Sequence, residues 1–253
     1  MATRKLTKSQ SERLSALRSH AAQELAEICG GDRELELTVG RRFADQIAPR
    51  AEGRAYRQSV FINCPFDDRY KPLLQAATFT IVRCGFIPRC ALESDDGSEA
   101  RFEKILDILE ECQFGIHDLS RIELDRGFPR FNMPLELGVF LGAKRYGRGA
   151  QDRKSCLIFE GKPNAYDRYI SDISGRDPVA HHNQSERVVQ GIRNWLASSA
   201  RRKAIAGSHK ILLDYEKFKR WLPRKCASAN LRVKDLLWIE FVELVAEWSR
   251  GTA

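Results

Sequence analysis

The chain has 253 residues, of which 43% are hydrophobic and 30% charged, a composition typical of globular proteins and not of disordered or fibrous ones. No apolar run reaches the roughly 20 residues that a membrane-spanning helix needs, and the first residues lack the apolar stretch of a signal peptide. We therefore expect a cytoplasmic protein without a membrane partner, large enough for one sizeable domain with appendages.

The net charge of +8 is unevenly distributed along the chain. Lys and Arg exceed Asp and Glu by 11 to 8 in residues 1–58 and by 12 to 6 in residues 197–253, but residues 59–196 have 19 against 20. A basic C-terminal region could bind nucleic acid or an acidic partner, although a solvated helix surface is the commoner origin of such charge. The seven cysteines show no CxxC spacing, so we expect reduced, buried thiols and no metal site.

Residues 7–31 carry apolar side chains at helical spacing and end at two glycines, which predicts an amphipathic helix. Its apolar stripe must pack against the main domain or against a second copy of the chain. The only other signal before residue 59 is a short strand at residues 35–39. We interpret residues 1–58 as an N-terminal helical extension.

From residue 59 onward, short apolar runs alternate with helical patterns. Strands are expected at residues 59–63, 86–92, 114–120 and 154–161, and helices at residues 70–85, 98–113, 134–147 and 185–200. Because consecutive parallel strands need crossover connections, this alternation predicts an α/β domain over residues 59–196, with an open parallel sheet of the flavodoxin or Rossmann type.

Residues 197–253 are predicted to form a basic C-terminal helical extension. Its helices, at residues 210–222 and 233–250, are expected to be separated at Pro223 and at the short segment 227–230.

In open α/β sheets ligands bind where loops leave the carboxyl ends of the strands. Asp118 follows the third strand directly and could either accept hydrogen bonds from ribose hydroxyls or cap its own turn with Ser120. His117 should face the other side of the sheet and is left out of the chemistry. The first loop offers a bend at Pro65 and an aromatic face at Phe66, with polar groups at Asn63 and Asp67.

Glu136 stands among apolar residues near the start of a helix that Asn132 and Pro134 are expected to open. The helix dipole there should keep the carboxylate ionised although it is half-buried. An anion beneath the anomeric carbon can stabilise or capture the cationic sugar formed when an N-glycosidic bond breaks. Nicotinamide leaves NAD as a neutral molecule and needs no general acid, so NAD suits a site with a single carboxylate.

No glycine-rich phosphate loop is present, so we expect no redox cofactor and treat NAD as a substrate. A diphosphate would have to be bound by arginines such as Arg89 or Arg130.

The segments FINCPFD, GIHDLSR and MPLELGVFLGAKRYG, in this order, resemble the nucleoside 2-deoxyribosyltransferase-like proteins, which are similar in architecture to TIR-type domains. The resemblance covers residues 59–196. It implies that Glu136 is the catalytic nucleophile or charge stabiliser and Asp118 the sugar ligand. It also implies a base pocket lined by Asn63, Pro65 and Phe66. The other expected substrate-binding residues are Asp67 in the first loop and Asn132 and Met133 before the glutamate.

The transferases carry a DxGT segment where this chain has RFNMP, which disfavours transfer between bases more than bond cleavage. Members of both groups act as N-glycosidase or NADase effectors in bacterial anti-phage defence, so the resemblance implies an NAD hydrolase that forms homo-oligomers or binds a defence partner. The alternatives are a nucleoside 2-deoxyribosyltransferase and a nucleotide-sensing or partner-binding module without catalysis. Residues 171–182, with Ser171, Asp172, Asp177, His181 and His182, are interpreted as a lid over the sugar pocket rather than as a metal site.

Overall fold

The structure is a computed structural model that describes most of the chain from Ala55 onward. The described residues are 55–93, 97–98, 100–120, 124–125, 128–129, 131–164, 166, 170, 176–200 and 205–252. They belong to one compact unit that begins at Ala55. The helix expected at residues 7–31 and the strand expected at residues 35–39 lie outside these residues.

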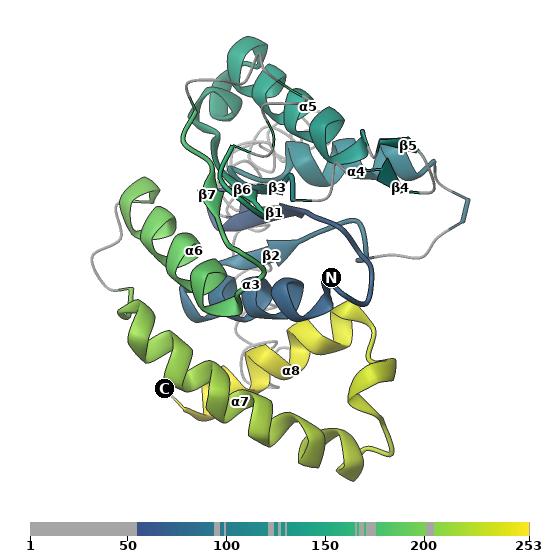
Figure 1. Ribbon diagram of the computed structural model, residues 1–253, viewed down its shortest axis with the longest axis vertical. Coiled ribbons are helices and arrows are strands. Elements are labelled where there is room, and N and C mark those ends of the chain that lie inside the picture. Colours follow the sequence, from purple (N-terminus) through teal and green to yellow (C-terminus); the bar gives the residue numbers. More distant parts are fainter. Residues whose placement is uncertain are drawn as a thin grey trace, which may run out of the picture. The chain divides into compact units, whose positions relative to one another are not determined.

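The predicted α/β fold with a parallel sheet is confirmed (Figure 1). The five strands lie in the order β2-β1-β3-β6-β7, and every neighbouring pair is parallel. The strands are β1 (Ser59–Asn63), β2 (Ile87–Arg89), β3 (Phe114–Asp118), β6 (Ser155–Glu160) and β7 (Val179–Ala180). The sequence pattern predicted the first four, whereas the two residues of β7 are too few to leave a periodic signal.

The helices cover both faces of the sheet (Figure 1). On one face, α3 (Lys71–Arg83) and α6 (Ser185–Ser199) pack over alternate residues of the strands, among them Val60, Ile62 and Phe159. On the other face, α4 (Arg101–Glu110) and α5 (Asn132–Tyr146) pack over Phe61. The hairpin of β4 (Leu124–Asp125) and β5 (Phe128–Pro129) precedes α5, and the 3-10 turn η1 (Gly149–Arg153) follows it.

Gly85 ends α3 as predicted. Its φ is +80°, a left-handed conformation that glycine adopts without steric cost. The N–H of Gly85 bonds to the carbonyl of Val82, and the N–H of Phe86 bonds to that of Ile81. These are the two hydrogen bonds of a Schellman motif, and they turn the chain directly into β2.

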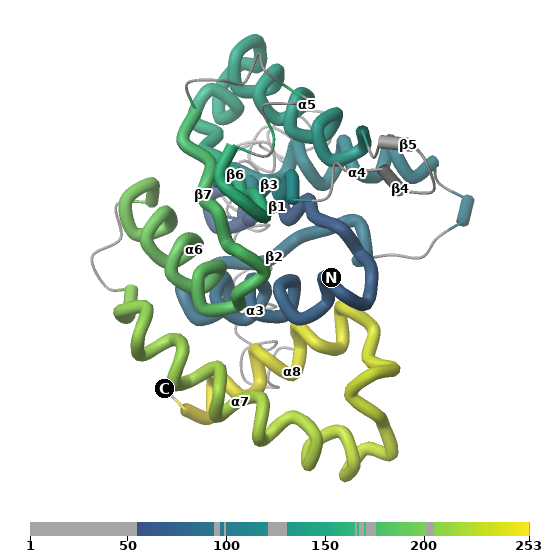
Figure 2. The backbone as a smooth tube through the Cα atoms, viewed as in Figure 1, coloured from purple at the N-terminus to yellow at the C-terminus, as the bar shows by residue number. Residues whose placement is uncertain are grey.

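The C-terminal helices pack against α3 (Figure 2). They are α7 (Ser208–Ser228) and α8 (Trp238–Gly251), joined by a 3-10 turn, η4 (Val233–Asp235). Phe79 of α3 contacts the rings of Phe218 and Trp248, and Arg83 forms a 2.8 Å ion pair with the buried Asp214. The C-terminal helices and the sheet therefore share one hydrophobic core.

The prediction that Pro223 separates two helices is wrong, because α7 continues through Pro223 to Ser228. The proline is exposed, so the carbonyl that loses its donor can bond to water. Leu222 and Cys226 are buried and hold this part of the helix to the core. In the described part of the chain no helix is long and apolar enough to cross a membrane.

Candidate functional site

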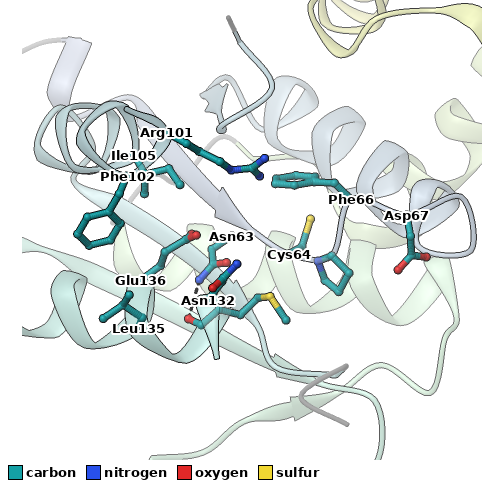
Figure 3. Close-up of a pocket in the computed structure, with 12 residues that line it drawn as sticks. Asn63, Cys64, Phe66, Asp67, Arg101, Phe102, Ile105, Asn132, Leu135 and Glu136 are labelled. Carbon is teal, nitrogen blue, oxygen red and sulfur yellow. Dashed lines mark hydrogen bonds between the residues drawn. The ribbon is translucent and has the colours of Figure 1, made fainter. Parts of the chain in front are cut away.

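A cavity of about 600 Å³ opens at the carboxyl edge of the sheet, at the end of β1 (Figure 3). It lies on the face that α4 and α5 cover, and both helices begin at its wall. The strand order places β1 and β3 at the point where successive crossovers diverge to opposite sides of the sheet, which is where α/β folds commonly bind ligands. The lining residues are Asn63, Cys64, Pro65, Phe66, Asp67, Arg101, Phe102, Ile105, Asn132, Met133, Leu135 and Glu136.

Seven of the nine predicted site residues line this cavity. They are Asn63, Pro65, Phe66, Asp67, Asn132, Met133 and Glu136, whereas Asp118 and Arg89 do not line it. Segments distant in the sequence thus come together as expected at the strand ends.

Glu136 is half-buried in the cavity wall, and its environment differs from the expected one. Helix α5 begins at Asn132, which is its first residue and not its cap, so Glu136 lies in the second turn. The helix dipole weakens beyond the first turn. Burial raises the pKa of Glu136 to about 7, and the positive charge of Arg101 opposes this rise only partly. The carboxyl group is therefore divided between its neutral and ionised forms near neutral pH.

Arg101 is the first residue of α4, and the sequence interpretation missed it. Its guanidinium extends into the cavity near Phe66 (Figure 3), and its positive charge acts on Glu136. Among the described residues no side chain forms an ion pair or a hydrogen bond with it. A cation at the start of the helix that follows β2, at the carboxyl edge of the sheet, was a signal that could have identified it.

The cavity also has aromatic walls. Phe66 and Phe102 are 37% and 40% exposed, so part of each ring is accessible from the cavity. Exposed rings beside polar groups are suited to stacking on a planar heterocycle. Asp67 belongs to the lining, but its carboxylate accepts hydrogen bonds from the backbone N–H groups of Arg69 and Tyr70 in its own turn.

Asn63 is held by two hydrogen bonds at the inner end of the cavity. Its Nδ2 donates to the backbone carbonyl of Met133 at 2.8 Å and lies 3.1 Å from Nδ1 of His117. His117 is fully buried between Phe61 and Phe140, and a Cβ on Gly115 would lie 2.8 Å from its Nε2. His117, which the sequence interpretation left out, therefore lies behind the cavity.

Asp118 lies on the opposite face of the sheet from Glu136. It is fully buried, and its carboxylate accepts hydrogen bonds from the hydroxyl of Tyr70 and, at 2.8 Å, from the N–H of Ser120. Nε2 of His181 lies 3.0 Å from the same carboxylate. Burial opposes ionisation of Asp118, but these partners outweigh it and lower its pKa. The geometry is that of the turn-capping alternative, and in the described part of the chain the carboxylate does not line the cavity.

Arg89, one of the two arginines expected to bind a diphosphate, is also paired within the fold. Arg89 pairs with Glu93 at 2.7 Å and with Glu111 at 2.9 Å. Burial opposes its charge, but the two carboxylates raise its pKa above the ordinary value. Arg130 lies outside the described residues.

Residues 171–175 of the predicted lid lie outside the described residues, but His181 is described and is buried against Asp118, away from the cavity. Its Nδ1 accepts a hydrogen bond from the N–H of Asn183 at 2.9 Å, so the ring proton is on Nε2, which faces the carboxylate. Within the described residues no three His, Cys, Asp or Glu side chains are placed to hold a metal ion. The six cysteines of the described part are free thiols, and burial raises the pKa of Cys64 beside the cavity.

Comparisons of the chain with protein-family models, with curated proteins and with solved structures found no match. The chemistry of the cavity is therefore the basis on which a function can be assigned.

Proposed function

We propose that the protein hydrolyses the N-glycosidic bond of a nucleotide, with NAD as the substrate and Glu136 as the catalytic residue. The observation that carries the proposal is the half-buried carboxyl group of Glu136, with a pKa near 7, in a cavity of nucleotide size that is also lined by aromatic side chains and a cation. The aromatic faces of Phe66 and Phe102 would stack on a base, and Arg101 would bind a phosphate.

Glu136 can act in the reaction as its ionised form. The electron pair of the bond between C1′ and the pyridinium nitrogen moves to that nitrogen, and nicotinamide leaves as a neutral molecule. The carboxylate stabilises the resulting oxocarbenium ion or forms an ester with C1′. Water then adds to C1′ and loses a proton, which a carboxylate with a pKa near 7 can accept. The products are nicotinamide, ADP-ribose and a proton.

The position of Asp118 supports a leaving group that needs no general acid. With Asp118 on the other face of the sheet and Asp67 bonded within its own turn, Glu136 is the carboxyl group in the cavity lining that is available for chemistry. A purine or pyrimidine base would need a second group to protonate it as it leaves. Nicotinamide does not.

The test is to incubate purified protein with NAD and to measure free nicotinamide. We expect release by the wild type and by Glu243→Gln, a control that makes the same chemical change at an exposed position of α8, and at least a hundredfold slower release by Glu136→Gln. Equal rates for the two variants would refute the role of Glu136. Exchange of nicotinamide for an added free base would indicate a transferase, and nucleotide binding without turnover would indicate a sensor. If hydrolysis occurs in cells, expression should lower cellular NAD.

A further inference from the structure

One buried amide in the cavity wall keeps an acceptor atom without a partner. Asn63 is only 3% exposed, although it lines the cavity (Figure 3). The two hydrogens of its Nδ2 are directed at the carbonyl of Met133 and at Nδ1 of His117. In the part of the chain that the structure describes, no group donates a hydrogen bond to Asn63 Oδ1. Asn63 Oδ1 is not one of the fully buried side-chain atoms without a partner in the described residues, so it keeps access to the cavity, where a ligand can donate a hydrogen bond to it.

The orientation of the amide follows from its neighbours. The carbonyl oxygen of Met133 can only accept, so a reversed amide would place two acceptor oxygens 2.8 Å apart. Because Nδ2 only donates, Nδ1 of His117 must be the acceptor, and the proton of the neutral ring is on Nε2. Burial lowers the pKa of His117 to about 3, with a contribution from the charge of Lys154. The ring therefore stays neutral, and Nδ1 remains an acceptor throughout the physiological pH range.

We propose that Asn63 Oδ1 is a fixed hydrogen-bond acceptor that selects ligands presenting an N–H or O–H donor to the inner end of the cavity. His117 is the positioning residue that keeps the amide in this orientation. The inference deepens the proposed function and depends on it only for the identity of the ligand. In a nucleotide the donor is a carboxamide N–H or a ribose hydroxyl.

The selection has a direct physical reason. A ligand donor replaces the water that Oδ1 would otherwise bind, and the amide is already in place and needs no reorientation. A carbonyl or carboxylate oxygen at the same point would face the lone pairs of Oδ1 and would leave both atoms without a donor. Sites built to bond a polar group reject analogues that lack it more strongly than apolar sites reject a difference in size.

The experiment measures equilibrium binding by calorimetry in the Glu136→Gln background, so that no turnover is needed. Nicotinamide mononucleotide against nicotinic acid mononucleotide tests the carboxamide donor, and AMP against dAMP tests the 2′-hydroxyl donor. We expect the member without the donor to bind at least about tenfold more weakly in one of these pairs. The pair that discriminates identifies the donor. In Asn63→Leu the difference should fall to about twofold or less.

Variants of His117 test the positioning role. In His117→Asn, the side-chain oxygen is bonded to Cγ, as Nδ1 is in histidine, so it can accept the hydrogen bond from Nδ2 of Asn63. Discrimination between the members of the ligand pair should therefore be retained. His117→Leu offers no acceptor and should reduce discrimination. Thr80→Val, which removes a buried hydrogen bond within α3, is the control for a general loss of stability. In ¹⁵N NMR spectra, Nδ1 of His117 should show the unprotonated signal between pH 8 and pH 5.

The outcomes separate the inference from the proposed function. Equal binding within both pairs, or discrimination that persists in Asn63→Leu, would overturn the selection by Asn63. Discrimination that persists in His117→Leu would overturn the role of His117. A protein that discriminates within a pair but never releases nicotinamide from NAD would refute the proposed hydrolase and leave the acceptor in place.

Discussion

Replacing Glu136 with Gln should stabilise the folded protein, and the gain should depend on pH. Gln has the shape of the neutral acid but cannot ionise. The folded pKa of Glu136 is raised from 4.5 to about 7 because the half-buried carboxylate loses hydration that the unfolded chain provides. The ionised form is therefore disfavoured in the fold, as is common for groups retained for chemistry rather than for stability.

The magnitude follows from the two pKa values. One pKa unit corresponds to about 1.4 kcal/mol, so ionised Glu136 costs the fold about 3 kcal/mol above pH 7. Below pH 4.5 the group is neutral in both states and the cost disappears. It grows as the pH rises from 4.5 to 7, and at pH 5 it should be about 1 kcal/mol or less.

The assay is thermal unfolding of the wild type and of Glu136→Gln at pH 5 and pH 8, with Glu243→Gln as the exposed control. For a compact unit of this size, about 3 kcal/mol corresponds to a rise in Tm of roughly 6–12 °C at pH 8. At pH 5 the rise should be only a few degrees, and the control should change little at either pH. A rise of the same size at both pH values, or a lower Tm for the variant at pH 8, would show that burial does not control the pKa of Glu136.

Three further predictions concern other charged residues. Arg101→Gln should raise the pKa of Glu136 further, because the guanidinium opposes the effect of burial; a ¹³C NMR titration of the carboxyl carbon would measure this, and an unchanged value would refute the interaction. Asp118→Asn should destabilise the protein by about 3 kcal/mol at pH 7, and the loss should shrink as the pH falls below 3.8 because the folded pKa is lowered; urea unfolding at pH 7 and pH 3 would test it. Lys154 is buried, bonded to two backbone carbonyls, and has a pKa lowered to about 8, so its charge disfavours the fold below pH 8. Relative to Lys154→Met, the free energy of unfolding of the wild type should therefore rise by on the order of 2 kcal/mol between pH 7 and pH 10. If urea unfolding gave the same difference between the two proteins at both pH values, this prediction would be contradicted.

The sheet could be predicted from the sequence because its strands are buried on both faces. All five residues of β1 and of β3 are buried, and residues 60–62 and 114–116 form short apolar runs between helical periods. Strand order is not encoded in these local patterns, because it depends on which side of β1 each crossover returns to. The alternation of strands and helices therefore indicated that loops would meet at one edge. The expectation that Asn63 and Glu136 share a pocket came from the resemblance and not from this alternation.

The separation of His117 from Asp118 illustrates this limit. Strand alternation predicted that the two side chains lie on opposite faces, and they do. Alternation does not indicate which face carries the cavity. That depends on α4 and α5 packing on the His117 side, so the carboxylate that resembled a sugar ligand is closed within the core and the histidine left aside lies behind the site.

The same topology explains why Glu136 works without a second carboxyl group in this proposal. Asn63, Arg101 and Glu136 come from the end of one strand and the starts of two helices, and they meet because both helices cover one face of the sheet. Asp118 is excluded from that face by the pleat of β3, and moving it there would require a one-residue shift in register that would move every side chain of the strand to the other face of the sheet. A site built on this face therefore favours a substrate whose leaving group already carries the positive charge that a general acid would otherwise supply.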